Sequence, residues 1–417
     1  MGTILETIGN TPLVRLRRCV PPSGAELWLK LEYRNPTGSM KDRMALAMIN
    51  GAERDGLISP GDTVVEYTGG STGPAVALVC RAKGYRALIV IADCFTAERF
   101  QLMRALGAEL DVVPSVEGPP KVTPQDIANM VARAGQLAAE PGHYATDQFN
   151  NPYIIPDHRD RLGREIWDQT GGRVTAFCHG MGTASSLMGV SDALKPHGVF
   201  IQGHEPAGSA AIGGGAPGPF LIQGWTGSVM PHWYPERVDH VEAIGDEEAL
   251  DMTRRLAAEE GIFAGISTGA NVVGAHRLAE RLGSTAVVVS LAVDTGFKYM
   301  RLKRSRRSSC VTASSIASSF RSVAPYRARS SCSRSCASRG SRTASRPRGG
   351  GRRSTRPSTR WASVRTQSSS NAATSSVRNP SPISSSAAPN NWAFRRTSAT
   401  SSVTRSGISS PPAARTC

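Results

Sequence analysis

The residues around Lys41 have the types and spacing to hold a reactive amine. Lys41 follows a turn-forming run, 35–39, and comes two residues before Arg43, at the expected start of a helix. An amine near a helix N-terminus and beside a cation lies in a positive potential, which favours its neutral, nucleophilic form. Such an amine can form a Schiff base with a carbonyl compound. In the alternative interpretation, Ser39 caps the helix, Asp42 completes an approximate capping box, and Lys41 points to solvent.

Three glycine-rich loops that carry hydroxyl side chains also precede expected helices. Their sequences are TGGSTG at 68–73, GMGTASS at 180–186 and GISTG at 265–269. In α/β folds, ligands bind beyond the carboxyl ends of the strands, where such loops lead into helix N-termini. The backbone N–H groups and hydroxyls of these loops can therefore hold anionic groups of a ligand.

The loop 180–186 has the composition of a phosphate cradle. Gly182 lets a phosphate approach the backbone, and the hydroxyls of Thr183, Ser185 and Ser186 add donors. Ser185 stands where a dinucleotide motif has its third glycine, and no P-loop lysine follows. A small phosphorylated cofactor therefore fits better than a nucleotide. The alternative is an ordinary turn between a strand and a helix.

The loop 68–73 suits a carboxylate or a ring oxygen. Thr68, Ser71 and Thr72 supply hydroxyls beside the backbone N–H groups of another helix start. The alternative is that Thr68 or Ser71 only caps the helix.

Thr295 is expected at the same edge of the sheet, because it follows the apolar strand 286–289. A neutral hydroxyl facing a pyridine nitrogen leaves that nitrogen largely unprotonated and weakens the ring as an electron sink. This setting favours elimination over transamination. The alternative is an ordinary turn threonine.

Short apolar runs alternate with helical patterns through the first 300 residues. The alternation predicts an α/β fold with mainly parallel sheet. Expected strands are 27–31, 63–66, 87–91, 174–177 and 286–289, and expected helices are 39–55, 72–83, 97–106, 124–139, 184–195, 246–260 and 269–283.

The positive charge of the chain is concentrated at its C-terminal end. Residues 301–417 contain 22 Arg, one Lys and no Asp or Glu, whereas residues 1–300 hold 26 basic and 33 acidic residues, a net charge of −7. With 33 Ser and no sustained apolar period, this tail cannot bury enough apolar surface to fold, so we expect disorder. It is either an arm that binds nucleic acid or the product of a shifted reading frame. The complete lack of acidic residues favours the frameshift.

The remaining composition favours a cytoplasmic protein without a metal site. Cys80, Cys94 and Cys178 lie in or beside apolar runs and no CxxC pair occurs, so we expect reduced, structural thiols. The eight histidines lack the spacing of a metal site, and we expect a structural role for His179. The N-terminus lacks a signal-peptide pattern, and no run of about eighteen apolar residues could span a bilayer.

Seven motifs occur in the order found in cysteine synthases. The chain from 1 to about 300 resembles that branch of the fold type II pyridoxal-phosphate enzymes. The resemblance implies two three-layer αβα subdomains with mainly parallel sheets, a smaller mobile one at about 40–145 and a larger one from 1–39 and 146–300. The motifs are 8–14, 39–43, 68–73, 148–152, 182–186, 265–269 and 294–296.

The resemblance also implies pyridoxal 5′-phosphate as the cofactor and a role for each motif. Lys41 is then the covalent anchor of the cofactor and the base that moves the Cα proton of the substrate. Thr295 faces the pyridine nitrogen, and Ser71 lies near the ring oxygen of the cofactor. The implied phosphate ligands are Gly182, Thr183, Ala184, Ser185 and Ser186, and the implied ligands of the substrate carboxylate are Thr68, Gly69, Ser71, Thr72 and Gln148.

The implied activity is β-replacement on an O-activated serine. O-acetylserine plus sulfide or another thiol would give cysteine or an analogue through an α-aminoacrylate intermediate. The same chemistry without a nucleophile is β-elimination, as in a serine/threonine dehydratase or a cysteine desulfhydrase. A catalytically impaired relative whose basic tail binds nucleic acid is the alternative from another class. The resemblance further implies a homodimer.

Four places depart from the family pattern. Ser71 stands where asparagine is usual, and Gly69 where serine is usual. The segment 184–186 has Ala-Ser-Ser instead of Gly-Gly-Thr, and Trp225 replaces a smaller residue. Serine keeps a hydrogen-bond donor but is shorter than asparagine, so the substrate can differ from O-acetylserine.

Overall fold

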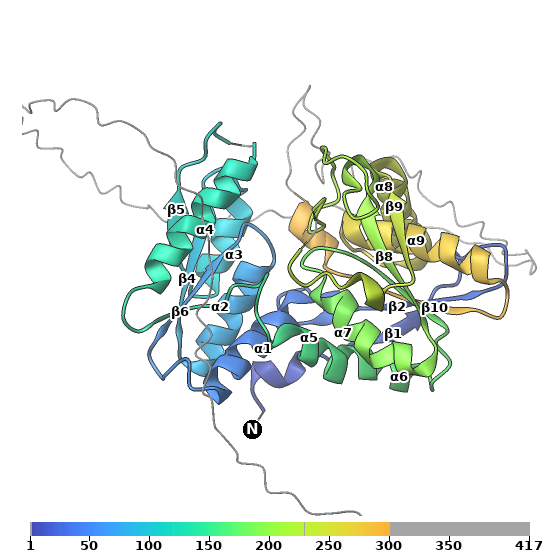
Figure 1. The fold of residues 1–417 in the computed structure, drawn as a ribbon, viewed down its shortest axis with the longest axis horizontal. Helices are drawn as coiled ribbons and strands as arrows, with labels where there is room; N and C mark the ends of the chain where they lie inside the picture. Colours follow the sequence, from blue (N-terminus) through green and yellow to red (C-terminus); the bar gives the residue numbers. More distant parts are fainter. Residues whose placement is uncertain (1, 120, 229, 301–417) are drawn as a thin grey trace, which may run out of the picture. The chain divides into compact units, whose positions relative to one another are not determined.

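The computed structural model describes residues 2–119, 121–228 and 230–300, and the expected disordered tail 301–417 lies outside them. Two mainly parallel sheets organise the described part of the chain (Figure 1). The predicted α/β fold with mainly parallel sheets is confirmed.

The larger sheet has six strands in the order β1-β2-β10-β7-β8-β9. Only β1 runs antiparallel to its neighbour, so the carboxyl ends of the other strands share one edge. Helices supply the crossover connections that parallel strands need. The strands are β1 (Leu13–Arg15), β2 (Glu26–Lys30), β7 (Ala176–Gly180), β8 (Phe200–Pro206), β9 (His240–Ile244) and β10 (Val287–Leu291), and the helices are α5 (Ile154–Asp157), α6 (Arg164–Gln169), α7 (Ser185–Leu194), α8 (Asp246–Arg255) and α9 (Ile266–Leu282).

Helices cover both faces of this larger sheet. One core joins Val288 of β10 to Leu250 of α8 and Leu278 of α9. A second core joins Val289 of β10 to Leu187 of α7 and to α6. Every residue of β7 is consequently buried, as is usual for a central parallel strand.

The smaller sheet has four parallel strands in the order β5-β4-β3-β6. Ile49 of α1 and Val76 of α2 pack on one face, and Met130 of α4 packs on the other. The strands are β3 (Thr63–Tyr67), β4 (Arg86–Ala92), β5 (Glu109–Val113) and β6 (His143–Ala145), and the helices are α1 (Lys41–Arg54), α2 (Thr72–Lys83), α3 (Ala97–Ala105) and α4 (Pro124–Ala138).

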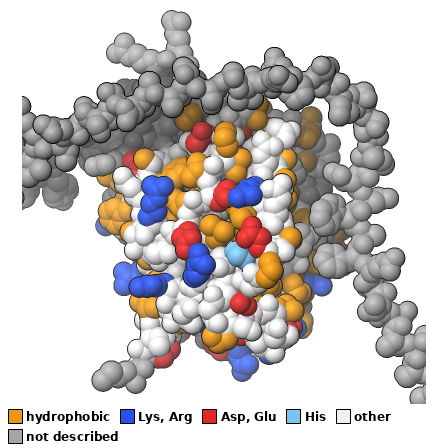
Figure 2. Space-filling model, turned by 90° about the vertical axis from the view of Figure 1, so that its left-hand side faces the viewer, with side chains coloured by type: hydrophobic (Ala, Val, Ile, Leu, Met, Phe, Trp, Pro, Cys, Tyr) orange, Lys and Arg blue, Asp and Glu red, His pale blue; other side chains and the backbone are white. Residues whose placement is uncertain are grey.

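The outer surface beside the smaller sheet is of mixed character. Figure 2 shows acidic and basic side chains interspersed among apolar ones, with no patch of one sign on the described residues of this face. Within the described ranges, no helix is long and apolar enough to cross a membrane.

Most of the expected elements occur, some with shifted ends. The helix expected at 39–55 begins at Lys41, because Ser39 pairs with Asp294 in a β-bridge instead. The helix expected at 246–260 ends at Arg255 and continues as a π-helix, Leu256–Glu260. Five strands and two helices were missed by the sequence analysis: β1, β5, β6, β8, β9, α5 and α6.

Candidate active site

Lys41 is the first residue of α1, and backbone hydrogen bonds fix its place beside the end of β10. Met40 N donates to Val293 O at 3.0 Å, and Thr295 N donates to Gly38 O at 3.0 Å. These bonds bring together two of the predicted site residues, Lys41 and Thr295, from opposite ends of the described chain.

The side-chain amine of Lys41 has no partner among the residues that the structure describes. It is partly buried and makes no hydrogen bond or ion pair with the described residues. Burial lowers the pKa of Lys41 to about 8, against the opposing attraction of Asp294. An amine with this pKa is available as a nucleophile and as a base near neutral pH.

The cause of this lowered pKa differs from the expected one. Burial lowers the pKa of Lys41, and the expectation that Arg43 does so was wrong. The Arg43 guanidinium is held in a buried cluster, where it contacts Glu32 at 2.7 Å and Glu165 at 2.7 Å. Lys30 pairs with the same Glu165 at 2.7 Å. Because removing one partner would strand the other charges, this cluster firmly anchors the start of α1.

The alternative interpretation, a capping box between Ser39 and Asp42, does not hold, although Ser39 Oγ accepts from Lys41 N at 3.3 Å. The Asp42 carboxylate accepts a hydrogen bond from Thr37 N at 2.7 Å and another from the Thr37 hydroxyl, instead of one from Ser39 N. The N-cap residue of α1 is Met40, which makes no side-chain capping bond. Asp42, which follows the turn, thus closes it from downstream.

The loop 180–186 joins β7 to α7 and presents unused donors. The Thr183 and Ser185 hydroxyls are buried and lie 2.7 Å apart. The dipole of α7 favours an anion at this end of the helix. The loop N–H groups that donate to none of the described residues are those of Gly182, Thr183, Ala184 and Ser186.

Close packing explains why this loop needs glycine. A Cβ on Gly182 would lie 2.5 Å from the carbonyl oxygen of Gly224, and a Cβ on Gly180 would lie 2.0 Å from Trp225 Nε1. The bulky Trp225 therefore packs against the start of the loop. Its buried indole N–H has no partner in the described part of the chain.

The buried side-chain amide of Asn271 holds the start of the loop 180–186 in place. Asn271 Oδ1 accepts from Gly180 N at 2.8 Å, and Asn271 Nδ2 donates to Leu291 O at 2.9 Å and contacts His179 Nδ1 at 3.2 Å. Burial lowers the pKa of His179 to about 3, so this ring is neutral. His179 has a structural surrounding, as expected.

The loop 68–73 joins β3 to α2. The Thr72 hydroxyl donates to Gln148 Oε1 at 2.8 Å, and Gln148 Nε2 contacts Glu66 Oε1 at 3.3 Å. Neither Thr68 nor Ser71 caps α2 through its side chain, so the capping alternative was wrong. The N–H groups of this loop without an acceptor among the described residues are those of Gly69, Ser71, Thr72 and Gly73.

Phe95 and Arg99, both from the smaller half, contact Gly69. The sequence analysis missed both residues. A Cβ on Gly69 would lie 2.1 Å from the ring of Phe95, which explains why glycine stands where serine is usual. Arg99 of α3 donates to the carbonyl oxygen of Gly69 and, at 2.9 Å, to Gln223 Oε1 of the larger half. Arg99 lies in an expected helix, but no local pattern distinguishes it from other surface arginines.

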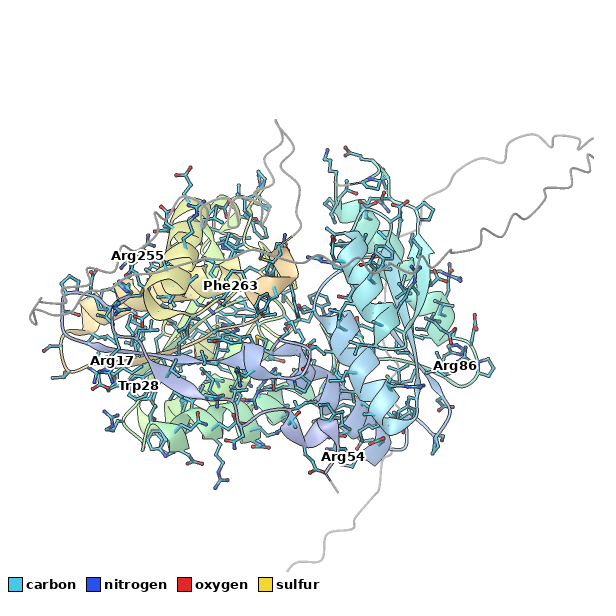
Figure 3. All side chains as sticks on the ribbon, turned by 180° about the vertical axis from the view of Figure 1, so that it is seen from behind. Arg17, Trp28, Arg54, Arg86, Arg255 and Phe263 are labelled. Carbon is cyan, nitrogen blue, oxygen red and sulfur yellow. The ribbon has the colours of Figure 1, made fainter. Side chains whose placement is uncertain are left out.

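A third missed residue, Lys298, contacts Ser71. Lys298 belongs to a short 3₁₀-helix, η8 (Gly296–Tyr299), and its Nζ lies 3.0 Å from Ser71 Oγ. Phe263, which is labelled in Figure 3, supports η8 by packing edge-on against Phe297, with ring centroids 5.1 Å apart. In the sequence, the one feature that could have pointed to Lys298 is its place two residues after the motif 294–296.

The Thr295 hydroxyl accepts one structural hydrogen bond, and the described residues leave its O–H donor unused. Its hydroxyl oxygen accepts from Phe297 N at 3.3 Å, which caps η8, and its proton is donated to none of the described residues. The segment 265–269, expected as a loop before a helix, instead forms the start of α9, which begins at Ile266. It supports this region, because Thr268 Oγ1 accepts from Val293 N at 3.1 Å.

The assembled groups fit a cofactor that carries both an aldehyde and a phosphate. Lys41 offers an unpaired amine, and the start of α7 offers unused N–H donors for an anion. The start of α2 offers a second set of donors, which suits the carboxylate of an amino acid. Pyridoxal phosphate has the two groups that the first two features require.

A family model described as "Pyridoxal-phosphate dependent enzyme" matches residues 4–294. The chain belongs to this family. Its cofactor is therefore pyridoxal phosphate, as predicted, and the protein is an enzyme of the fold type II architecture.

Known relatives of this pyridoxal-phosphate enzyme include cysteine synthases. The cysteine synthase of Staphylococcus aureus is 40% identical over 304 residues, which cover 72% of this chain and 96% of the relative. The crystal structure of an O-ureido-L-serine synthase matches with a TM-score of 0.67 and 36% identity, covering 76% of this chain and 99% of its own. A hydrogen sulfide-producing enzyme from Fusobacterium nucleatum matches with a TM-score of 0.66 and 32% identity, covering 72% and 98%. The resemblance drawn from the sequence is confirmed.

Proposed function

We propose that the enzyme catalyses β-replacement on an O-activated serine, with O-acetylserine and sulfide giving cysteine and acetate. The bond from Cβ to the ester oxygen breaks, and a bond from Cβ to sulfur forms. The observation that carries this proposal is the unpaired Lys41 amine between two helix starts whose N–H groups are unused. The 40% identity to a cysteine synthase over 96% of its length supports it.

Lys41 has two tasks in this proposal. When bound, pyridoxal phosphate supplies a conjugated ring that withdraws electrons from the Cα–H bond of the substrate. Lys41 holds the cofactor until the substrate arrives, and its freed amine then takes the Cα proton. With a pKa of about 8, the amine can accept and return a proton near neutral pH.

The two loops bind the charged ends of the ligands. The backbone of Gly182–Ser186 and the hydroxyls of Thr183, Ser185 and Ser186 hold the cofactor phosphate. Thr295 faces the pyridine nitrogen as a neutral hydroxyl, which favours loss of a β-substituent over transamination. The substrate carboxylate is held by Thr68, Gly69, Ser71, Thr72 and Gln148.

Purified protein loaded with pyridoxal phosphate tests this proposal. We expect it to form cysteine from O-acetylserine and sulfide, and the Lys41→Ala variant to lose at least about 1000-fold in rate, because it lacks both the anchor and the base. The matched control is Lys83→Ala, a lysine on α2 whose amine pairs with Glu53 instead. Equal cysteine formation by wild type and Lys41→Ala would overturn the assignment.

β-Elimination is the second candidate, and the match to a hydrogen sulfide-producing enzyme favours keeping it. In that case nothing adds at Cβ. The released enamine tautomerises to an imine, and water hydrolyses its C=N bond to give a keto acid and ammonia. Incubation with cysteine and with O-acetylserine separates the two activities, because elimination yields pyruvate and replacement yields a new thiol or thioether. A dominant pyruvate yield in the presence of sulfide would replace our proposal with this one.

Other sequence predictions stay proposals. We infer a cytoplasmic homodimer whose smaller subdomain, about 40–145, moves against 1–39 and 146–300; the two separate sheets support this division. Size-exclusion chromatography with light scattering tests the dimer. The alternative of a nucleic-acid-binding tail lies outside the described residues. Salt-dependent retention on DNA that vanishes on removal of 301–417 would support it.

A further inference from the structure

Lys298 reaches the loop 68–73 from the other half of the molecule. It follows β10 of the larger sheet, whereas Ser71 precedes α2, which packs on the smaller sheet. The 3.0 Å contact between Lys298 Nζ and Ser71 Oγ therefore joins the two halves at the predicted substrate loop. Both side chains are partly buried.

The charges around Lys298 come from three places in the fold. Asp294 before η8 and Asp42 of α1 favour its protonated form, while Arg99 of α3 opposes it. Burial is the largest effect and lowers the pKa of Lys298 from its usual value. Apart from burial, the two carboxylates outnumber the one guanidinium, so the neighbouring charges favour the ammonium, and the bond runs from Lys298 Nζ to Ser71 Oγ. An ammonium can only donate, so Ser71 Oγ is the acceptor of this bond.

This bond leaves the Ser71 proton without an acceptor. A serine hydroxyl has one O–H donor and two acceptor lone pairs. Ser71 does not cap α2, and its hydroxyl donates to no residue in the described part of the chain. Because Lys298 occupies one lone pair, the O–H must point to a different group. A hydroxyl that accepts a hydrogen bond from a cation becomes a stronger hydrogen-bond donor through its own O–H.

We propose that Lys298 is a positioning residue that fixes the Ser71 hydroxyl as a donor to an anionic oxygen in the site. That oxygen belongs either to the cofactor ring or to the substrate carboxylate. The inference rests on the proposed function, because both oxygens belong to its ligands. An asparagine at position 71 would carry its own amide donors and would not need the lysine.

A double-mutant cycle tests this coupling. Apo forms of the wild type, Lys298→Met, Ser71→Ala and the double variant are titrated with pyridoxal phosphate, and cofactor affinity is read from the quenching of tryptophan fluorescence. The KM and kcat for O-acetylserine are measured on the loaded proteins. When Ser71 is present, we expect Lys298→Met either to weaken cofactor binding or to raise KM for O-acetylserine, by about 3- to 10-fold. In the Ser71→Ala background the same change should be less than about twofold.

The two arms distinguish the recipient of the Ser71 proton. Coupling in the cofactor affinity assigns the ring oxygen, and coupling in KM with kcat unchanged assigns the substrate carboxylate. Lys298→Arg, which keeps a cationic donor, should restore most of the lost affinity. In a Ser71→Asn background, Lys298→Met should again have little effect.

Additive losses would overturn the inference, because Lys298 would then act through its charge alone. No loss in any background would overturn it as well. If Lys298→Met fails to fold, as judged by thermal unfolding, Lys298→Gln takes its place in the same cycle. A wild type that binds the cofactor and forms cysteine while the cycle is additive contradicts only this inference, whereas a wild type that binds no cofactor contradicts the proposed function too.

Discussion

The loops 180–186 and 68–73 both present unused N–H groups at a helix N-terminus, but different parts of the molecule complete them. The first is shaped mainly by backbone packing, with Gly182 against the carbonyl of Gly224. The second depends on side chains from distant segments, with Phe95 over Gly69 and Lys298 on Ser71.

This difference indicates which residues of the enzyme can be substituted without loss of its reaction type. A backbone cradle accepts the same phosphate whatever the substrate is, so its requirements are geometric. If the second loop binds the substrate carboxylate, as we propose, side chains around it can vary together and alter which amino acid is bound. Gly69 with Phe95, and Ser71 with Lys298, are two such combinations in this chain.

Gly182→Ala would break the backbone cradle and should have the largest effect on this comparison. The new Cβ would lie 2.5 Å from a backbone oxygen, which cannot rotate away, so the loop must shift. We expect cofactor affinity to fall by about 100-fold, measured by fluorescence titration of the apo protein. Gly135→Ala is the control, because that helical position has open space and alanine should be neutral or slightly stabilising there. Unchanged affinity in Gly182→Ala would refute the backbone account.

Gly69→Ser would test the side-chain account of the second loop. Its Cβ would collide with the ring of Phe95, which is a movable side chain, so the effect should be smaller. We expect KM for the amino acid to rise about tenfold with little change in cofactor affinity. Adding Phe95→Ala should restore most of the loss. A double variant no better than Gly69→Ser would show that the ring is not the obstacle.

Glu66 gives the smallest and most specific test, because it lies behind the second loop and contacts Gln148. Burial raises the pKa of Glu66 to about 7 from an ordinary 4.5. The unfolded chain loses this proton at a lower pH than the folded one does. The Glu66 contribution to the free energy of unfolding is therefore fully favourable below about pH 4.5 and falls as the pH rises to about 7.

Glu66→Gln should remove this pH dependence. We compare the free energy of unfolding of the variant with that of the wild type by urea unfolding. The difference, variant minus wild type, should rise by about 1–3 kcal/mol from about pH 5 to about pH 8. Glutamine keeps only one acceptor oxygen, so losing the hydrogen bond from Thr146 or from Tyr67 N adds an offset that does not vary with pH. A difference that stays constant with pH would show that Glu66 titrates normally.

The sequence predicted what depends on local pattern. The helix at 72–83 has the expected bounds, and Lys41 lies at a helix start, as expected. The segments 68–73 and 180–186 lead from strands into helices, because glycine and hydroxyl residues mark such turns locally. The strand β8 was missed because the polar residues Gln202, His204 and Glu205 interrupt its apolar pattern. These side chains are buried through tertiary contacts that no local pattern reports.

The expectations that were wrong depended on contacts between distant segments. Arg43 seemed placed to act on Lys41, yet Glu32 and Glu165 hold its guanidinium. Lys298 was not predicted for the same reason, since only the fold brings it to Ser71. The alternative of a capping box failed through a local contact instead, because Asp42 binds Thr37 upstream.

Trapping the cofactor with borohydride tests the central claim most directly. Reduction of the loaded protein should attach pyridoxal phosphate irreversibly to one lysine, and peptide mass spectrometry identifies which one. We predict that the peptide containing Lys41 carries the label and that Lys41→Ala carries none. A label on Lys298, the other partly buried lysine beside the site, or on no lysine at all would contradict the assignment.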